Sequence, residues 1–263
     1  MSKLQGLLFG LATLVLVVVA VFFFTRPWLP PLMSDRGAID DAIWLSLVVT
    51  GAVFVATNLT LAWFGFRYQD RSGARATYWH DDPRLEWGWT LATAAVMFVI
   101  LFRALGLWAQ VTSAAPPDAF VVEVTGQQFA WNVRYPGPDG IFGRTDVKLV
   151  NPPAFNFIGL DRSDPAAADD LTLQNQLFLP EGRPVRVRIR SLDVIHSFFL
   201  PEFRVKQDAM PGMITEDWFI PRKAGTYEIA CAEHCGLGHY RMRGMVTVLP
   251  PGEVEARIRE AAE

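Results

Sequence analysis

The stretch on which the interpretation of this chain rests is CAEHCGLGHYRM, which runs from Cys231 to Met242. Two thiols, the imidazole of His239 and a thioether fall within it, and its two cysteines are the only ones in the chain. Soft sulfur ligands combined with imidazole select copper over magnesium, calcium or manganese. A second imidazole, His196, lies upstream in the segment DVIHSF. One blue-copper ion takes one Cys, two His and a weak axial Met, so this larger set suits two copper ions that share both thiolates. The predicted chemistry is electron transfer.

Two other interpretations of the same residues are a disulfide and a zinc site. A lone cysteine pair in an oxidising compartment is usually a disulfide. Structural zinc sites are normally built from paired C-x2–4-C and H-x3–5-H units, whereas here Cys235 is followed by one histidine and then by Met242. Methionine is a poor zinc ligand and a good copper ligand, so ligand softness and ligand number favour two copper ions.

The chain resembles subunit II of haem-copper cytochrome c oxidases from about Ile43 to Leu249. The family pattern C-x-E-x-C-x3-H-x2-M is matched within residues 231–242. An upstream pattern, D-V-x-H-S-[FW] followed by P, K-x-D and P-G, is matched by Asp193, His196, Ser197, Phe198, Pro201, Lys206, Asp208, Pro211 and Gly212.

The resemblance implies a dinuclear copper centre, called CuA, and a set of ligands for it. The two cysteines would bridge the copper ions, each histidine would bind one of them, and the methionine would be a weak axial ligand. The glutamate between the cysteines would bind through its main-chain carbonyl, and its side chain would reach a magnesium ion shared with subunit I. The implied metal ligands are His196, Cys231, Glu233, Cys235, His239 and Met242.

The resemblance also implies routes for electrons and protons. The family segment G-x-Q-W-x-W reads GQQFAW at residues 126–131, so Phe129 stands where the family's usual tryptophan receives electrons from cytochrome c. Trp131 is an alternative relay, although a buried aromatic in a strand is more often a core residue, and we expect it to be mainly structural. Electrons would leave through His239 towards the haem of subunit I. Glu86 matches the glutamate of the family pattern E-x-x-W-T at the mouth of a proton channel, but a glutamate in a first helical turn is also favourable to the helix dipole.

The first 110 residues hold three long apolar runs, and the first two contain no charged residue. Each run is long enough to cross a bilayer as a helix, which takes about 20 residues. The first run could be a secretory signal, but signal cores are shorter and no A-x-A-like cleavage site follows Phe24, so we expect it to be retained. The predicted transmembrane region covers residues 1–111, with helices at about 4–25, 43–66 and 87–109.

Basic residues predict the orientation of these helices. The loop between the second and third runs carries four arginines and the loop after the first run only two. The positive-inside rule therefore places residues 67–86 in the cytoplasm and residues from about 112 onward outside. We expect the plasma membrane of a bacterium, with the copper domain on the periplasmic side. The arginines concerned are Arg67, Arg71, Arg75 and Arg84 in the inner loop and Arg26 and Arg36 in the outer one.

From Phe120 the sequence changes to short alternating segments separated by turn residues. Within residues 183–191, Val185, Val187 and Ile189 alternate with Arg186, Arg188 and Arg190, which predicts a half-buried strand with a solvated arginine face. With the resemblance, we expect an all-β cupredoxin-like Greek-key barrel over 112–250, an irregular insertion at 136–170 that caps the barrel or touches a partner, and a helical tail at 251–263. Further strands are expected at 120–125, 129–135, 171–179, 197–200, 214–221, 226–231 and 244–249.

The leading functional prediction is the electron-input subunit of a terminal oxidase, in which the oxygen chemistry and its catalytic residues belong to subunit I. Electrons would come from cytochrome c or another c-type haem donor, and oxygen reduction would be coupled to proton translocation. Asp193 either belongs to the cytochrome c side, as in the family, or caps a turn. Expected partners are subunit I, other oxidase subunits and the membrane; the net charge of −3 and the lack of a Lys/Arg block argue against nucleic acid. The alternatives are the CuA subunit of a nitric oxide reductase and a membrane-anchored copper store or chaperone.

Overall fold

The computed structural model describes residues 3–68, 73, 75 and 77–263, so Arg71 lies outside the described residues. The chain forms two compact units. The first contains residues 1–29 and 38–108, and the second contains residues 30–37 and 109–263. The segment 30–37, which the sequence placed within the transmembrane region, therefore belongs to the unit that contains the β domain.

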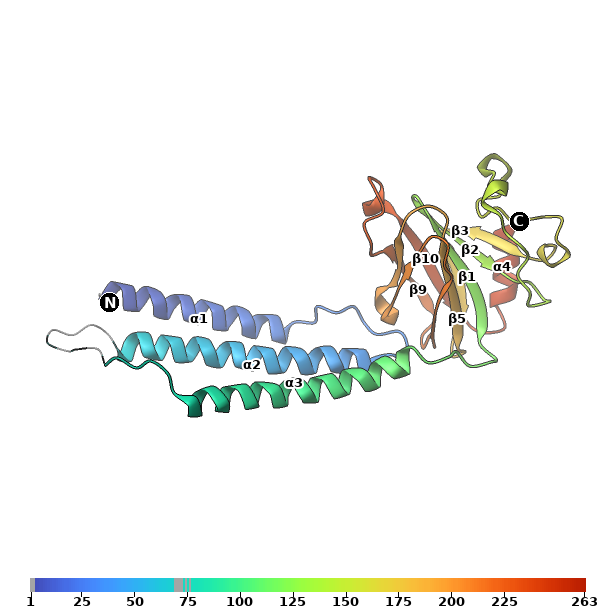
Figure 1. Cartoon of the computed structure of the whole chain (residues 1–263). Helices are drawn as coiled ribbons and strands as arrows, with labels where there is room; N and C mark the ends of the chain where they lie inside the picture. The colour runs from blue at the N-terminus through green and yellow to red at the C-terminus, as the bar shows by residue number, and fades with distance from the viewer. Residues whose placement is uncertain (1–2, 69–72, 74, 76) are drawn as a thin grey trace. The chain divides into compact units, whose positions relative to one another are not determined.

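The first unit consists of three long helices, α1 (Lys3–Thr25), α2 (Gly37–Arg67) and α3 (Pro83–Val111) (Figure 1). All three are long and apolar enough to cross a membrane. No residue of α2 or α3 is buried, and helices that expose apolar side chains all round fit a lipid environment. Both begin before their apolar runs, because their first turns hold residues that are favoured at helix N-termini. Asp40 lies in the first turn of α2, and Pro83 is the first residue of α3, where proline is favoured.

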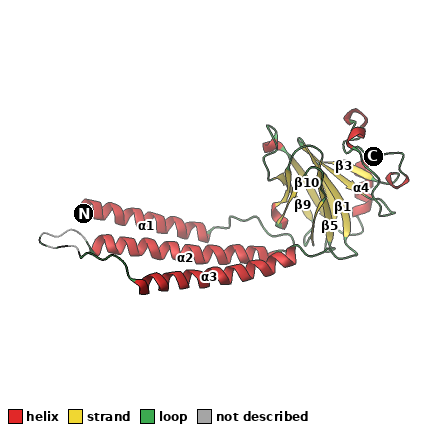
Figure 2. Ribbon diagram, viewed as in Figure 1, coloured by secondary structure: helices red, strands yellow, loops and turns green. Residues whose placement is uncertain are grey.

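The second unit is built on two five-stranded sheets, of strand order β3-β2-β1-β5-β8 and β4-β10-β9-β6-β7 (Figure 2). The strand orders are not sequential, so the chain crosses repeatedly between the sheets. The expected architecture of apolar N-terminal helices followed by an all-β cupredoxin-like domain is confirmed. The strands are β1 (Phe120–Gln127), β2 (Ala130–Tyr135), β3 (Leu171–Gln174), β4 (Gln176–Pro180), β5 (Val185–Ser191), β6 (His196–Leu200), β7 (Val205–Ala209), β8 (Thr215–Phe219), β9 (Gly225–Cys231) and β10 (Arg243–Leu249).

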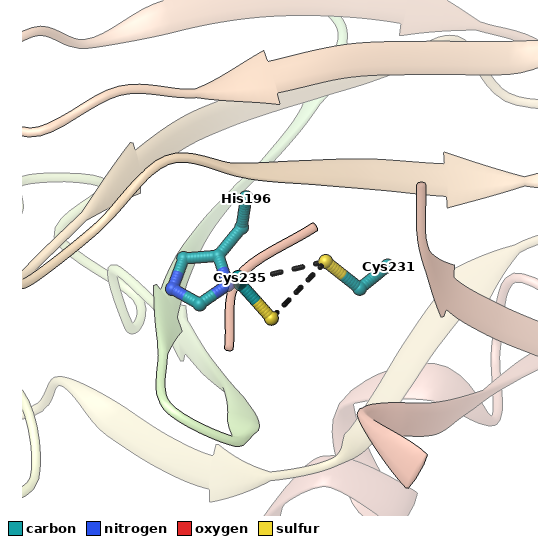
Figure 3. A group of neighbouring side chains, drawn as sticks. All are labelled: His196, Cys231 and Cys235. Atoms are coloured by element: carbon teal, nitrogen blue, oxygen red, sulfur yellow. Dashed lines mark hydrogen bonds between the residues drawn. The ribbon is translucent and has the colours of Figure 1, made fainter. Parts of the chain in front are cut away.

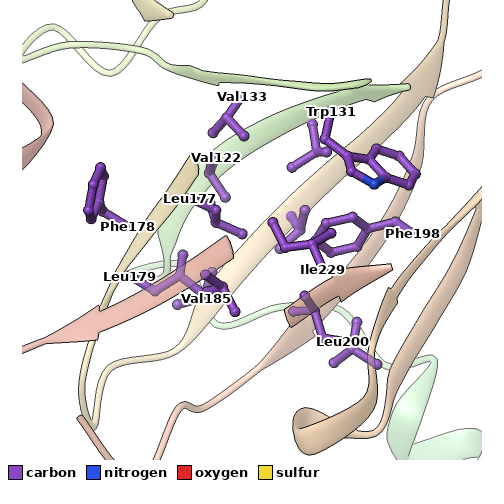
Figure 4. Packing of buried hydrophobic residues seen from close by; sticks show 14 of the residues in the cluster. Val122, Trp131, Val133, Leu177, Phe178, Leu179, Val185, Phe198, Leu200 and Ile229 are labelled. Atoms are coloured by element: carbon purple, nitrogen blue, oxygen red, sulfur yellow. The ribbon is translucent and has the colours of Figure 1, made fainter. Parts of the chain in front are cut away.

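The hydrophobic core draws side chains from both sheets (Figure 4). Strand β5 has the predicted alternation, with Val185, Val187 and Ile189 fully buried. The C-terminal helix α4 (Val254–Ala262) closes one part of this core, where its residues Val254 and Ile258 are buried. The apolar positions of α4 are four residues apart and so lie on one face of the helix, which is why a short charged helix packs against β3 and β4.

Two strand predictions differ from the structure. Residues 171–179 form two strands in different sheets, because Asn175 between them adopts a left-handed conformation with φ of 58°. Asparagine tolerates this conformation better than most residues, and its side-chain Oδ1 accepts a hydrogen bond from the main-chain N–H of Trp131. Strand β7 was not predicted, because its sequence VKQDA has only two apolar residues, Val205 and Ala209, separated by three polar ones.

The insertion at 136–170 caps the outer face of the sheet that contains β1, β2 and β5. The guanidinium of Arg134 donates to Glu123 at 2.6 Å, to Asp170 at 3.2 Å and to the carbonyl of Gly143 at 2.7 Å. Within the insertion, the ring of Phe142 packs beneath the guanidinium of Arg134. Glu123 and Arg134 are almost fully buried, with side-chain exposures of 1% and 3%. The insertion is therefore held to the sheet by a buried ionic cluster.

This capping corrects the prediction of a solvated arginine face on β5. Only Arg186 behaves as expected, in an exposed ion pair with Glu216. Arg188 and Arg190 point towards the buried carboxylate of Glu123, at 3.8 Å each. The alternation of arginine with valine and isoleucine shows which side chains share a face of the strand, but it does not show what covers that face. Here the insertion, and not solvent, covers Arg188 and Arg190.

The segment 30–37 runs along the β domain as a short strap. The N–H of Met33 donates to the carbonyl of Glu202, and the carbonyl of Met33 accepts from the N–H of Arg222. Arg36 forms a buried ion pair with Asp217 of β8, with Nη1 to Oδ2 at 3.2 Å. Residues 30–37 thus pack as part of the β domain, although two apolar helices lie between them and that domain in the sequence.

Candidate metal centre

The sulfur and imidazole groups singled out by the sequence gather at one end of the sheet that contains β6 and β9. Cys231 ends β9 and His196 begins β6, and the two strands pair at Phe198 and Cys231. Cys235 lies in the loop that follows β9, and His239 begins a single 3-10 turn (η5, His239–Arg241). Figure 3 shows the His196 ring and the two cysteine side chains converging on one another.

The donor atoms lie in a chain of close contacts. Cys231 Sγ is 3.8 Å from Cys235 Sγ and 3.9 Å from His196 Nδ1. Cys235 Sγ is in turn 3.7 Å from His239 Nδ1 and 3.7 Å from Met242 Sδ. Each sulfur therefore has its own imidazole neighbour, and the thioether lies beside the second sulfur.

The main-chain carbonyl of Glu233 joins this group, because its oxygen lies 3.2 Å from Cys231 Sγ. The Glu233 residue itself is exposed, whereas Cys235 and Met242 are buried. The six residues singled out as ligands thus lie around one pair of sulfur atoms, and they come from two strands and one connecting loop.

Both cysteines are free thiols, and their surroundings push their pKa values apart. Burial acts to raise the pKa of Cys231, but hydrogen bonds from His196 and from the main chain of Ser197 outweigh it and bring the pKa to about 6. Burial and the negative charge of Cys231 raise the pKa of Cys235 to about 11. Near neutral pH the pair therefore carries one thiolate, and a metal ion that binds both sulfurs must displace a proton from Cys235.

This donor set fits a soft metal. The ligand atoms of His196, Cys231 and Cys235 all lie within 4.8 Å of one another, a grouping that could hold a metal ion. Nδ1 of His239 lies instead beside Cys235. Two thiolates, two imidazoles and a thioether match the ligand preference of copper and have no counterpart in magnesium or calcium sites.

Residues around His196 hold its ring in place. Its Nε2 lies 2.8 Å from Oδ1 of Asp193, and burial, which acts to lower the pKa of His196, is outweighed by hydrogen bonds to Cys231 and Asp193 that raise it. The ring of Trp131 packs edge-on against it, with centroids 5.9 Å apart. A Cβ on Gly126 would come within 2.8 Å of the imidazole, so glycine is needed there. Nδ1 is thereby left facing the sulfur atoms.

Not every residue singled out in the sequence lies at this cluster. Glu86 lies in the first turn of α3, in the helical unit. Phe129 does lie at the cluster, where its ring packs over Gly236 and Gly238. Both glycines belong to the loop between β9 and β10, residues 232–242, which is called the ligand loop below. Sequence reasoning gave no role to Gln128, which donates a hydrogen bond to the carbonyl of Cys235. The only signal for it was its place in the segment GQQFAW, next to Phe129.

Comparison with known proteins places the chain in a family. A family model described as the periplasmic domain of cytochrome c oxidase subunit II matches residues 120–249. The alternative cytochrome c oxidase subunit 2 of Bradyrhizobium diazoefficiens is 39% identical over 254 residues, which cover 95% of this chain and 91% of that protein. The chain belongs to the cytochrome c oxidase subunit II family. The copper centre expected from this family coincides with the sulfur and imidazole cluster, and the family's periplasmic domain corresponds to the β domain of the second unit.

More distant relatives align over most of the chain or over its β domain. Cytochrome c oxidase subunit 2 of Cereibacter sphaeroides is 28% identical over 250 residues, which cover 90% of this chain and 79% of that protein. A crystal structure of the periplasmic domain of subunit II from Bradyrhizobium japonicum is 28% identical, with a TM-score of 0.41, and covers 56% of this chain and 96% of that one. The alignments with the first two relatives span 254 and 250 residues, so they include the helical unit as well as the β domain.

Proposed function

We propose that this chain is the electron-input subunit of a terminal oxidase, accepting electrons from cytochrome c and delivering them to the haem of subunit I. The observation that carries the proposal is the pair of sulfur atoms 3.8 Å apart, each with an imidazole nitrogen beside it, in a chain of this family. Reduction of oxygen to water, coupled to proton translocation, then takes place in subunit I.

The proposed ligands divide between two copper ions. The thiolates of Cys231 and Cys235 would hold both ions, while His196 and His239 would each hold one of them. Met242, with its Sδ 3.7 Å from Cys235 Sγ, and the carbonyl of Glu233, 3.2 Å from Cys231 Sγ, would be the weaker ligands. When bound, such a pair of coppers supplies a one-electron relay whose charge is shared between two ions. The chain's own part is to hold the donors rigid and to exclude water, which the burial of His196, Cys235 and Met242 achieves.

The same loop also serves the contact with subunit I in this proposal. The exposed side chain of Glu233 reaches a magnesium ion at the border with that subunit, and electrons leave through His239. His239 is half-buried, so part of its ring is accessible to a partner. The complete β domain lies on the periplasmic side of a bacterial plasma membrane, anchored by three transmembrane helices, of which the first is retained.

Electrons reach the centre through the loop that carries Phe129, while Trp131 serves the core. The Trp131 ring is fully buried and packs against Phe198 as well as His196, so a protein donor cannot touch it. Replacing Trp131 with phenylalanine is expected to leave the rate of electron input nearly unchanged and to lower the unfolding free energy by about 1–2 kcal/mol. Stopped-flow reduction and thermal unfolding measure the two quantities. A strong slowing of electron input with unchanged stability would assign Trp131 to the electron path instead.

Glu86 takes up protons at the cytoplasmic side in this proposal. It is an exposed residue in the first turn of α3, where its charge also suits the helix dipole. The Glu86→Ala enzyme is expected to lose a large part of its steady-state turnover while its copper centre is reduced at the normal rate. Turnover and copper reduction can be measured on the same preparation. Normal turnover in this variant would remove the proposed role.

Purification of the whole complex tests the function. A tagged chain is expected to bring with it a haem-containing subunit with a third copper ion, and the complex is expected to oxidise ferrocytochrome c with consumption of oxygen. Reduction of nitric oxide without oxygen consumption would point to the reductase instead. Copper that leaves rapidly to a mild chelator, from a chain that purifies alone, would point to a copper store.

A further inference from the structure

The loop between β1 and β2 is connected to two of the proposed ligands. The side-chain Nε2 of Gln128 donates a hydrogen bond of 2.5 Å to the carbonyl oxygen of Cys235. The main-chain N–H of the same residue donates a bond of 2.7 Å to Oδ2 of Asp193. Oδ1 of that carboxylate accepts from Nε2 of His196 at 2.8 Å. Gln128 therefore links the loop that carries one proposed ligand to the carboxylate that orients another.

Two glycines allow the backbone of the ligand loop to pack closely against Gln128 and Phe129. A Cβ on Gly236 would lie 2.8 Å from Nε2 of Gln128, and one on Gly238 would lie 2.5 Å from the ring of Phe129. Gly236 also has a φ of 128°, which side-chain-bearing residues rarely adopt. The backbone of the loop thus approaches Gln128 and Phe129 more closely than any residue with a side chain would allow.

We propose that Gln128 is a positioning residue of the copper centre. Its side chain fixes the carbonyl of Cys235, and its main-chain N–H fixes the carboxylate that orients His196. A single residue therefore sets the separation between a donor in the loop after β9 and a donor on β6. Phe129 supports this arrangement by packing on the loop. Outer-shell partners of this kind orient metal ligands and change metal affinity by about 10–100-fold when they are removed. The inference depends on the proposed function only where it concerns copper.

The adjacent glutamine provides a matched control. Gln127 carries the same side chain, but its Oε1 accepts only a 3.3 Å bond from Asn132, away from the ligand loop. Gln128→Leu keeps the size of the side chain and the main-chain bond to Asp193 but removes the bond to Cys235. Gln127→Leu makes the same chemical change one residue earlier. Both variants are compared with the wild type as full-length protein.

Two measurements separate the inference from the proposed function. The first measurement is hydrogen exchange in the metal-free protein. The main-chain N–H groups that close the ligand loop are those of His239, Arg241 and Met242. We expect them to exchange about fivefold faster in Gln128→Leu than in the wild type. In the copper-loaded protein, release of copper to a chelator is expected to be about 10–100-fold faster, with altered copper hyperfine couplings. Gln127→Leu should match the wild type in both. Unchanged hydrogen exchange and unchanged copper spectra in Gln128→Leu would overturn the inference. A wild-type protein that binds no copper would refute the proposed function. In that case the hydrogen exchange of the metal-free protein would still decide the role of Gln128.

Discussion

Replacing Cys235 with serine is expected to abolish the dinuclear centre while the β domain remains folded. Cys235 Sγ is the atom in contact with Cys231, His239 and Met242. A serine hydroxyl is nearly the same size, but it is a hard donor that stays protonated near neutral pH and cannot bridge two copper ions. We expect a loss in the rate of electron input larger than the roughly 100-fold upper value typical of outer-shell changes.

Copper content and stopped-flow reduction by ferrocytochrome c measure this loss, and unfolding of the metal-free variant provides the control for folding. Met245→Leu is a useful companion variant, because Met245 lies on β10 in the same domain and is 44% exposed, outside the ligand loop. It should behave as the wild type. A Cys235→Ser protein that still bound two copper ions per chain and accepted electrons at the normal rate would rule out the bridging role.

Replacing Arg134 with methionine is expected to have the largest effect on stability. The substitution leaves the carboxylates of Glu123 and Asp170, which are 1% and 0% exposed, without their main cationic partner. Removing one partner of a buried ion pair typically lowers the unfolding free energy by about 3–5 kcal/mol, because the remaining charge is buried and uncompensated. The insertion at 136–170 should also lose its attachment to the sheet and become sensitive to proteolysis.

The matched control lies on β5 of the same sheet. Arg186 pairs with Glu216 in an ion pair whose side chains are 42% and 40% exposed, and such surface pairs contribute about 0–1 kcal/mol. Unfolding of the full-length protein in detergent, followed by circular dichroism, compares Arg134→Met with Arg186→Met. Equal destabilisation by the two substitutions would show that the buried cluster does not hold the insertion.

Much of the fold could be predicted because its signals are local. The helices follow from uninterrupted apolar runs, and strands such as β5 follow from the alternation of Val185, Val187 and Ile189. The proposed ligands could be selected because soft donors are few in this chain and lie within one short stretch and one upstream segment. Their convergence in the structure reflects the pairing of β6 with β9.

What the sequence did not reveal depends on contacts between distant segments. The strap at 30–37 joins the β domain through Arg36 and Asp217, which are 181 positions apart, and no local pattern indicates such a pair. The arginines of β5 were predicted to face solvent, because the insertion that covers them has no sequence pattern that indicates its position. Gln128 was missed for a similar reason, since its partners Cys235 and Asp193 are identified only by the folded chain.

We propose above that two thiolates of this chain hold two copper ions in one electronic unit. The most direct test is the copper-to-protein ratio of the purified full-length protein together with its electron paramagnetic resonance spectrum. We expect two copper ions per chain and a mixed-valence signal in which one unpaired electron couples equally to both nuclei. A single copper ion per chain, or a disulfide between Cys231 and Cys235 in the fully loaded protein, would contradict it.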